Sequence, residues 1–491
     1  MVYVSTRGGA QADAPEAILR GIAADGGLFV DPALGESPFD WRQCLQKDAL
    51  GIQTMLLSYL LPGLDGMDEL VRRAYSGKFE TDELTPLVKV GGDYILELFR
   101  GPTSAFKDVA LSMLPQLVTA ARAKRGEKGE CVVLTATSGD TGKAALEGFH
   151  DVDGTRIFVF FPHEGVSAVQ RAQMVTQEGA NVTVCAVRGN FDDCQRGVKE
   201  AFAALSGDAE LAARGRTLTS ANSINIGRLA PQLGYYFIAY AALLREGRIA
   251  PGDPVDYVVP TGNFGDILAG WMAKRLGLPV GRLVCASNAN RVLTDFFQSG
   301  VYDRRRDFYR TDSPSMDILV SSNLERLLYY VSGGDGALVR RCMEQLAREG
   351  FYRFPEELME KLRAEFSACC CSDEEGRAVI GRLWREEGYL CDPHTAVAVH
   401  AARELRRSGD ADAPLVILST ASPYKFPGAV LEAIGGRAEG DEFARMDALA
   451  ALTGAAVPRG LAALREKEIL HRDVIAPEEM IPYIKKKLSE G

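Results

Sequence analysis

The sequence is poor in the residues that most often carry acid–base and metal chemistry in enzymes. Its 491 residues include only five histidines, with no His-x-x-x-His pair, and ten cysteines without a Cys-x-x-Cys pair. Neither a zinc ribbon nor a disulfide framework is indicated. Cys369, Cys370 and Cys371 are adjacent and could ligate a metal or oxidise, but we expect reduced thiols without a catalytic role. No metal site is therefore predicted, and an enzyme of this sequence needs another source of acid–base or electrophilic chemistry.

Long apolar runs and an excess of positive charge are also missing. The longest nearly unbroken apolar run, Tyr235–Leu244, is far shorter than the roughly 20 residues that span a membrane. The first residues resemble neither an export nor a transit signal. With 66 acidic against 56 basic residues, the net charge is −10, which disfavours nucleic-acid binding. We expect a cytoplasmic protein that binds neither nucleic acid nor membranes and captures any anionic substrate in a local site.

Short apolar runs alternate with helical patterns from about residue 130 onward. Strands, each followed by a helix, are predicted at 131–137, 156–162, 181–187, 217–222, 255–261, 282–288 and 415–420. Strands that are apolar at successive positions are typical of parallel sheets buried on both faces. The pattern therefore predicts a doubly wound α/β architecture.

The chain is expected to have four parts, two of them α/β domains. The predicted parts are an N-terminal segment at 1–90 with a helical pattern at 48–61, a first α/β part at 91–245, a second at 246–440 and a helical C-terminal segment at 441–491. The second part is expected to contain a polar, mostly helical insertion at about 295–385.

Two glycine-rich loops follow predicted strands. One contains Ser138, Gly139, Asp140, Thr141 and Gly142, and the other contains Gly262, Asn263, Phe264, Gly265 and Asp266. Glycine permits a positive φ, and backbone N–H groups at a helix N-terminus bind phosphate or carboxylate, although such loops also occur as plain connections. The first is not a nucleotide P-loop, because Thr137 and Ala144 stand where that motif needs glycine and Ser or Thr. The second lacks the three-glycine dinucleotide fingerprint.

A lysine precedes the apolar helical pattern that begins near residue 108. Thr103 or Ser104 is the predicted N-cap, which places Lys107 in the first helical turn. The positive end of the helix dipole disfavours an ammonium there and makes a neutral, nucleophilic amine easier to form. Asp108 offsets that effect, and such Lys–Asp pairs are also common on solvated surfaces.

A lysine, two anion-binding loops and few histidines together favour pyridoxal phosphate as the cofactor. This cofactor needs a lysine for its Schiff base, a glycine-rich helix N-terminus for its phosphate and a polar partner for its ring nitrogen. It supplies an electron sink that a histidine-poor protein lacks.

A family resemblance extends over essentially the whole chain. It rests on the motifs YVSTRGG (3–9), EAILRGIAADGGLFV (16–30), GPTSAFKD (101–108), TATSGDTGKAA (135–145), NSINIGRLAPQ (222–232), PTGNFGDILAG (260–270), DPHTAVA (392–398) and STASPYKFP (419–427). In these motifs the chain resembles bacterial threonine synthases of the longer, fungal-like class. Those are pyridoxal-phosphate enzymes of the tryptophan-synthase-β fold, also called fold type II.

The resemblance implies roles for individual residues. Lys107 would form the Schiff base, and the cofactor-binding set would be Gly262, Asn263, Phe264, Gly265 and Asp266. Thr420 is the expected partner of the ring nitrogen, with Ser419 and Ser422 as alternatives. The 138–142 loop would receive the substrate carboxylate and the cofactor's phenolic oxygen, although Asp140 stands where related lyases have Asn.

The resemblance further implies conversion of O-phospho-L-homoserine and water to L-threonine and phosphate. The expected substrate-binding residues are Thr103, Ser104, Ser138, Gly139, Asp140, Thr141, Gly142, Lys143, Ser220, Asn222, Ser223, Asn225 and Arg228. Arg228 could pair bidentately with the substrate phosphate. The alternatives are a phospho-amino-acid lyase or serine/threonine dehydratase of the same fold, and a non-catalytic pyridoxal-phosphate-binding homologue. A monomer is favoured over a dimer.

Overall fold

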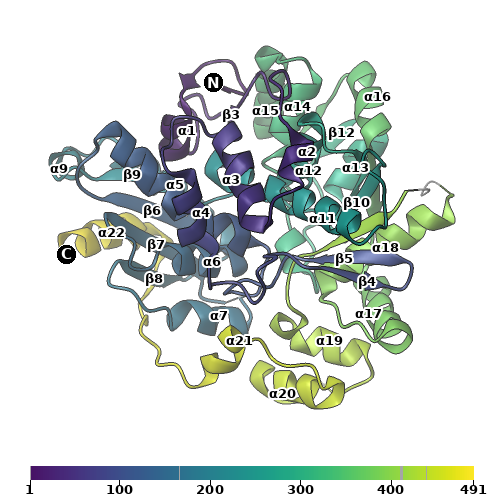
Figure 1. Ribbon diagram of the computed structural model, residues 1–491. Helices are drawn as coiled ribbons and strands as arrows, with labels where there is room; N and C mark the ends of the chain where they lie inside the picture. The colour runs from purple at the N-terminus through teal and green to yellow at the C-terminus, as the bar shows by residue number, and fades with distance from the viewer. Residues whose placement is uncertain (1, 165, 410–412, 438, 491) are drawn as a thin grey trace.

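The computed structural model describes residues 2–164, 166–409, 413–437 and 439–490 and contains two large β-sheets lying side by side (Figure 1). Helices pack on both faces of each sheet, as the doubly wound α/β prediction requires. Among the described residues, no helix is both long and apolar enough to cross a bilayer.

The smaller of these two sheets is parallel throughout. Its strands, in spatial order, are β16 (Val474–Ile475), β8 (Val182–Val187), β7 (Thr155–Pro162), β6 (Cys131–Ala136) and β9 (Thr217–Ser220). Alternate residues of β6 enter different hydrophobic clusters: Val133 lies in one and Val132 in the other. The strand is therefore buried on both faces, which is why its apolar residues are consecutive.

Helices from distant parts of the sequence cover the two faces of this sheet. The covering helices are α5 (Lys107–Arg125), α6 (Asp140–Phe149) and α7 (Ala168–Val175), with α8 (Phe191–Leu205) and α22 (Met480–Ser489) on the opposite face. The C-terminal segment runs from the second sheet to the first and ends with α22 beside α8 (Figure 1).

The larger sheet combines strands from both predicted α/β parts. Its order is β14 (Phe366–Cys370), β11 (Val280–Ser287), β10 (Val255–Pro260), β15 (Leu415–Ser419), β5 (Asp93–Glu97) and β4 (Leu87–Val90). All neighbours are parallel except β4 and β5, which form an antiparallel hairpin at one edge. The boundary at residue 91 thus falls inside a hairpin that belongs to this sheet; the four-part division itself stays a prediction.

Helices also cover both faces of the larger sheet. One face carries α12 (Gly265–Arg275), α13 (Val292–Ser299) and α16 (Glu356–Glu365); the other carries α17 (Asp373–Glu387), α18 (Pro393–Arg407), α19 (Pro427–Ala433) and α20 (Glu442–Thr453).

The N-terminal segment packs on the body through a small sheet and short helices. These are β1 (Tyr3–Ser5), β2 (Gln11–Ala12), β3 (Phe29–Val30), α1 (Ala14–Arg20), α2 (Trp41–Cys44), α3 (Ala49–Leu60) and α4 (Met67–Tyr75). The helical pattern at 48–61 is confirmed by α3, whose N-cap is Asp48. The fully buried Arg326 donates to the backbone oxygens of Phe29 (3.0 Å) and Ile224 (2.6 Å) and so joins this segment to the second half of the chain.

The 295–385 region differs from a simple peripheral helical layer. It contains α14 (Leu324–Val331), α15 (Gly336–Glu349), α16 and most of α17, but also the hairpin of β12 (Val301–Asp303) and β13 (Phe351–Arg353). Its strand β14 forms an edge of the larger sheet, and its 311–317 loop reaches the site described below. The remaining helices are α9 (Ala209–Ala213), α10 (Ile226–Leu229), α11 (Leu233–Arg245) and α21 (Arg459–Ala462).

Candidate active site

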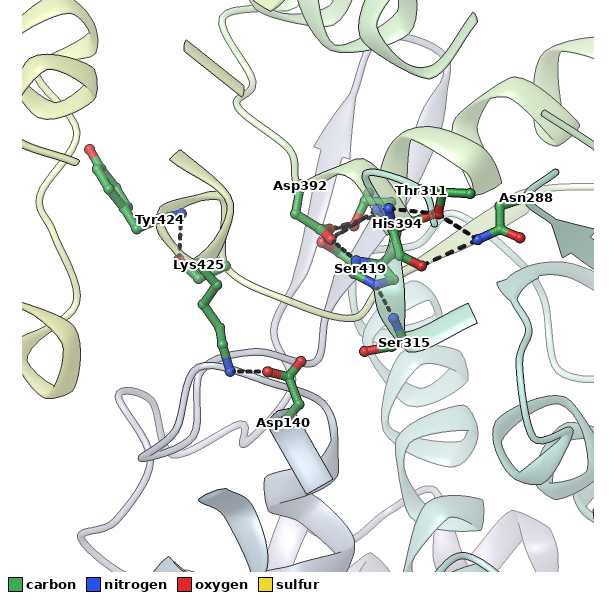
Figure 2. Close-up of polar contacts among 12 residues, drawn as sticks. Asp140, Asn288, Thr311, Ser315, Asp392, His394, Ser419, Tyr424 and Lys425 are labelled. Atoms are coloured by element: carbon green, nitrogen blue, oxygen red, sulfur yellow. Dashed lines mark hydrogen bonds and ion pairs between the residues drawn. The ribbon is translucent and has the colours of Figure 1, made fainter. Parts of the chain in front are cut away.

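Loops from both sheets meet at the N-terminus of α5. The loops that follow β6, β10 and β15 converge there, as expected for the carboxyl ends of strands in open α/β sheets. Figure 2 shows two polar clusters in this region, one around Asp140 and Lys425 and the other around His394 and Ser315.

The loop before α5 is held by an aspartate and not by a capping hydroxyl. Helix α5 begins at Lys107, and its N-cap is Phe106 without a side-chain hydrogen bond, so the predicted Thr103 or Ser104 cap is wrong. Instead, the Asp108 carboxylate reaches back and accepts from the Thr103 backbone N–H (2.8 Å) and hydroxyl (2.5 Å). Ser104 has a φ of 60°, and its carbonyl accepts from the Ser422 N–H at 3.1 Å.

The Lys107 amine lies among charged groups of both signs. Its Nζ donates to the Ser315 hydroxyl at 3.2 Å. Burial lowers the pKa of Lys107 to about 8, with Lys425 and Arg228 acting in the same direction against the opposing effects of Asp140 and Asp266. The Asp108 carboxyl is hydrogen-bonded to Thr103, and burial raises the pKa of this carboxyl to about 6. The amine is therefore easier to deprotonate mainly because it is buried, a cause that the dipole argument did not include.

The side chain of Thr137, the residue before the 138–142 loop, fixes the conformation of that loop by hydrogen bonds. The Thr137 hydroxyl oxygen accepts from the N–H groups of Gly139 (2.9 Å) and Gly142 (2.8 Å). Gly139 has a φ of 146°, and a Cβ there would lie 2.4 Å from the Gln170 side chain. Two N–H groups of the predicted anion nest are thus used internally. Ser138 is exposed and Thr141 is half-buried.

Asp140 forms a buried ion pair that the sequence analysis missed. Lys425, which is 0% exposed, places its Nζ 2.7 Å from Asp140 Oδ1. Gln170 donates to the same oxygen at 3.0 Å, and Lys425 also donates to the Thr103 carbonyl at 3.1 Å. Burial alone would raise the pKa of Asp140, but the Lys425 ammonium, with Lys107, holds it well below its usual range. A carboxylate in a loop expected to be buried indicates a nearby cation, and this was the signal that the sequence offered.

The 262–266 loop is held from outside by the 313–323 segment. The Gly262 carbonyl accepts from the Ser321 hydroxyl at 2.7 Å, and the Asn263 carbonyl accepts from the backbone and side-chain N–H groups of Asn323, both at 3.0 Å. A Cβ at Gly262 would lie 2.7 Å from the Ser315 carbonyl oxygen. Glycine is therefore required for this close approach.

Helix α12 begins within this loop, at Gly265. Phe264 is its N-cap in the left-handed conformation, with a φ of 64°, and Gly265 is its first residue. Burial raises the pKa of Asp266, the next residue, to about 7. The N–H groups at the helix N-terminus make this end of the site suitable for an anion, and the raised pKa leaves Asp266 partly protonated at neutral pH.

The three candidate hydroxyls at the end of β15 have different partners. Ser419 Oγ bonds with Thr395 Oγ1 at 2.8 Å, and Ser422 Oγ accepts from the Tyr424 N–H at 3.4 Å. Thr420 is buried and uses its carbonyl to accept from the Phe106 N–H at 2.8 Å. Two of the three hydroxyls are thus engaged within the protein, which favours Thr420 as the one open to a ligand.

A buried histidine supports the Ser315 loop and was also missed. His394 Nδ1 lies 2.6 Å from Asp392 Oδ2, and His394 Nε2 accepts from the Ser315 N–H at 3.1 Å. The Ser315 donor fixes the tautomer, so Nδ1 carries the proton that is shared with Asp392. Asp392 is 0% exposed and His394 is 2% exposed. The DPHTAVA motif was part of the resemblance, but its spacing gave no indication that it meets residue 315.

The predicted substrate-phosphate residues differ in how free their side chains are. Arg228 is buried; it donates to the Ala221 carbonyl at 2.8 Å, while its buried Nε has no partner among the described residues. Burial lowers the pKa of Arg228 to about 10, which keeps it charged near neutral pH. Asn225 caps α10 and donates to the Ile18 carbonyl at 2.9 Å.

The other predicted residues near Arg228 are only partly free. Ser220 Oγ accepts from the Asn222 N–H at 3.2 Å, and Asn222 and Ser223 are half-buried. Lys143 pairs with Glu147 at 2.8 Å and donates to Gln177. Arg228 therefore remains the best placed of this group, because it has an unpaired nitrogen and its charge acts on Lys107.

Comparison with known proteins identifies the class. Residues 83–421 match the model of the pyridoxal-phosphate dependent enzyme family, and residues 395–475 match that of the threonine synthase C-terminal region. The chain is thus a member of the pyridoxal-phosphate-dependent enzymes, with the mixed α/β architecture of fold type II.

Similarity over the full length identifies the family. A threonine synthase of Pseudomonas aeruginosa is 39% identical over 488 residues, covering 98% of this chain and 96% of that protein. The crystal structure of PLP-bound threonine synthase from Brucella melitensis has a TM-score of 0.87 and 38% identity, covering 100% of this chain and 99% of that one. Human threonine synthase-like 1 is 38% identical over 442 residues, and the match spans 85% of this chain but 58% of that longer protein. The chain belongs to the threonine synthase family.

Proposed function

We propose that the protein is a pyridoxal-phosphate-dependent lyase that converts O-phospho-L-homoserine and water into L-threonine and phosphate. The observation that carries this proposal is the position of Lys107, whose Nζ donates to the Ser315 hydroxyl at 3.2 Å where the loops after β6, β10 and β15 meet. Full-length similarity to threonine synthases supports the choice of reaction.

The residues present fit pyridoxal phosphate. Gly262 lets the loop lie against the Ser315 backbone, where a Cβ would come within 2.7 Å of the carbonyl oxygen, and Gly265 begins α12 beside it, so that helix N–H groups are available for a phosphate. We propose that Gly262, Asn263, Phe264, Gly265 and Asp266 bind the cofactor phosphate, that Lys107 holds the cofactor covalently and that the Thr420 hydroxyl contacts the ring nitrogen. When bound, the cofactor supplies an electron sink for negative charge at the substrate α-carbon.

Lys107 is the proposed proton carrier. With a pKa of about 8, a substantial fraction of the amine is neutral near physiological pH. Lys107 Nζ can then accept the α-proton and the β-proton of the substrate and later return a proton to carbon. The Ser315 hydroxyl, 3.2 Å from Nζ, orients the amine. Asp392 and His394 act through Ser315 as positioning residues.

Arg228 is the proposed principal ligand of the substrate phosphate. Its unpaired, buried Nε and retained charge suit a dianion; Ser220 ends β9, and Asn222 and Ser223 lie in the connection from β9 to α10, which carries Arg228. Asn225 is a weaker member of this set because its side chain is engaged in the α10 cap. Thr103, Ser104 and the segment from Ser138 to Lys143 are proposed to face the rest of the substrate.

The Asp140–Lys425 pair is proposed to set the charge beside the cofactor's phenolic oxygen. An ionised Asp140 alone would repel an anionic oxygen, and Lys425 neutralises it at 2.7 Å. The Asp140–Lys425 pair therefore keeps the local charge near zero.

Product analysis tests the proposed reaction. The purified holoenzyme is incubated with O-phospho-L-homoserine, and threonine, phosphate, ketobutyrate and ammonia are quantified. We expect one threonine for each phosphate released. Ketobutyrate and ammonia in place of threonine would instead identify a lyase or dehydratase of the same fold, and absence of turnover would favour a non-catalytic homologue.

We further propose that the protein acts in the cytoplasm as a monomer. All ten of its cysteines are free, as expected in a reducing compartment. The family resemblance favours a monomer over a dimer, and light scattering of the holoenzyme tests this directly.

A further inference from the structure

Three potential metal ligands meet at the edge of the larger sheet, on different elements. Cys371 follows β14, Glu375 lies in the first turn of α17, and His400 lies in the middle of α18. Each residue offers one ligand atom: the thiol sulfur of Cys371, a carboxylate oxygen of Glu375 and a ring nitrogen of His400. These three atoms lie within 4.8 Å of one another. Cys371 is 2% exposed, His400 is half-buried and Glu375 is exposed.

Local structure fixes the positions of these residues. The Cys371 backbone N–H continues the β14 ladder by donating to the Ser287 carbonyl at 2.9 Å. Ser372 caps α17, and Glu375 Oε2 accepts from the Ser372 N–H and hydroxyl, both at 2.8 Å. The capping box leaves the other Glu375 oxygen available. Because α17 packs against α18, His400 is presented from a second helix.

A thiol, an imidazole and a carboxylate together favour a divalent cation of borderline softness. Zinc binds thiolate, imidazole and carboxylate at about 2.0–2.3 Å, so its ligand atoms lie roughly 3.3–3.8 Å apart in a tetrahedral site. Small rotations of the partly exposed His400 and Glu375 side chains would close the cluster to this size. Magnesium and calcium prefer all-oxygen sites and suit it poorly.

We propose that Cys371, Glu375 and His400 bind one Zn²⁺ ion, with water as the fourth ligand. Binding replaces the Cys371 thiol proton, which is released to solvent, with a sulfur–zinc bond, and no oxidant or reductant is involved. The ion joins the end of β14, the N-terminus of α17 and the middle of α18. His394 lies six residues before His400, about 9 Å along α18, so the proposed ion stabilises the helix that supports the Ser315 loop without entering the active site.

Metal titration of the holoenzyme tests the proposal. Protein freed of metal with a chelator and dialysed is titrated with Zn²⁺ against a chromophoric competitor, and separately with Co²⁺ to observe thiolate-to-cobalt charge-transfer absorption. We expect one equivalent of tightly bound Zn²⁺, a Co²⁺–thiolate band and a higher melting temperature with Zn²⁺. Cys371→Ser and His400→Ala should each weaken Zn²⁺ binding at least tenfold and remove the zinc-dependent rise in melting temperature.

Matched variants separate this site from general thiol or imidazole binding. Cys370→Ser removes the neighbouring thiol and His163→Ala removes a distant imidazole; both should bind Zn²⁺ like the parent. Glu375→Gln preserves the capping box, so it should weaken zinc binding while leaving the zinc-free melting temperature unchanged. Absence of stoichiometric binding, or equal binding by the parent, Cys371→Ser and His400→Ala, would overturn the proposal. A loss in Cys370→Ser as large as in Cys371→Ser would also overturn it.

Discussion

The two glycine-rich loops resemble each other in sequence, but their buried acids lie in opposite electrostatic surroundings. Asp140 is the first residue of α6 and Asp266 the second residue of α12, and both are at most 5% exposed. Lys425 lies 2.7 Å from Asp140 and, with Lys107, holds the pKa of that carboxyl down against the effect of burial. Asp266 has no ion pair among the described residues, and burial raises its pKa to about 7.

The difference shows how one short pattern can serve two purposes. A partly protonated Asp266 repels a phosphate at the N-terminus of α12 less than an ionised carboxylate would, whereas an ionised Asp140 is neutralised by a cation from a distant segment. Lys107 lies between the loops, and the charges of both acids act on it. The following predictions change one side of this arrangement at a time.

Removal of Lys107 is expected to have the largest effect. Lys107→Ala takes away the proposed proton carrier and the covalent attachment of the cofactor, so threonine formation should fall by at least about 10³-fold. Borohydride reduction of the parent holoenzyme, followed by peptide mapping, should locate the cofactor on residue 107. Lys274→Ala, a lysine near the end of α12, is the control and should retain normal activity. Substantial threonine formation by Lys107→Ala would refute the assigned role.

Removal of Lys425 should destabilise the folded protein strongly. Lys425→Met leaves Asp140 buried and unpaired, which costs about 3–5 kcal/mol of unfolding free energy. Urea denaturation of the variant and of Asp140→Asn/Lys425→Met measures this, and the double variant should regain much of the lost stability. The surface pair of Lys124 and Asp65 gives a matched control, because the loss in Lys124→Met should be at most about 1 kcal/mol. Equal losses in the two lysine variants would contradict the contrast between the pairs.

The two acids should also make stability depend on pH with opposite signs. The folded-state pKa of Asp266 is above its ordinary value of 3.8. Asp266 therefore makes its full contribution to the unfolding free energy below about pH 4, and this contribution is lost as the pH rises to about 7. The loss is up to about 4 kcal/mol. The pKa of Asp140 is lowered, so its contribution is present above about pH 4 and is lost on acidification.

Denaturation across this pH range tests the sign. Asp266→Asn does not titrate, so the decline in stability between about pH 4 and 7 should be smaller than in the parent. Asp140→Asn serves as the comparison, since it should alter the acid limb of the profile below about pH 4. A parent-like decline in Asp266→Asn would show that Asp266 is already ionised in the folded protein.

Local sequence predicted the strands and the loops, but not the contacts that decide their chemistry. Strands β6, β7, β8 and β9 of the smaller sheet were predicted, and in β6 consecutive apolar residues mark burial on both faces; β16 was missed because the segment at 441–491 was expected to be helical. Strand β14, with the sequence FSACC, lacks that apolar run because it lies at a sheet edge. The pairing of Lys425 with Asp140 and of His394 with Ser315 joins residues that are distant in sequence, and spacing alone carries no information about such contacts.

The smallest effect is expected for substitution of Gly262, where the 262–266 loop lies against the Ser315 backbone. A Cβ at Gly262 would lie 2.7 Å from the Ser315 backbone oxygen, and that oxygen cannot move without shifting the loop that orients Lys107. Gly262→Ala should cost about 1–3 kcal/mol of unfolding free energy, and the displaced loop should also weaken pyridoxal-phosphate binding in a spectroscopic titration. Gly207→Ala is the control because open space surrounds Gly207. If Gly262→Ala bound the cofactor as tightly as Gly207→Ala, the 262–266 loop would not be the binding site of the cofactor phosphate. The raised pKa of Asp266 would then need another explanation.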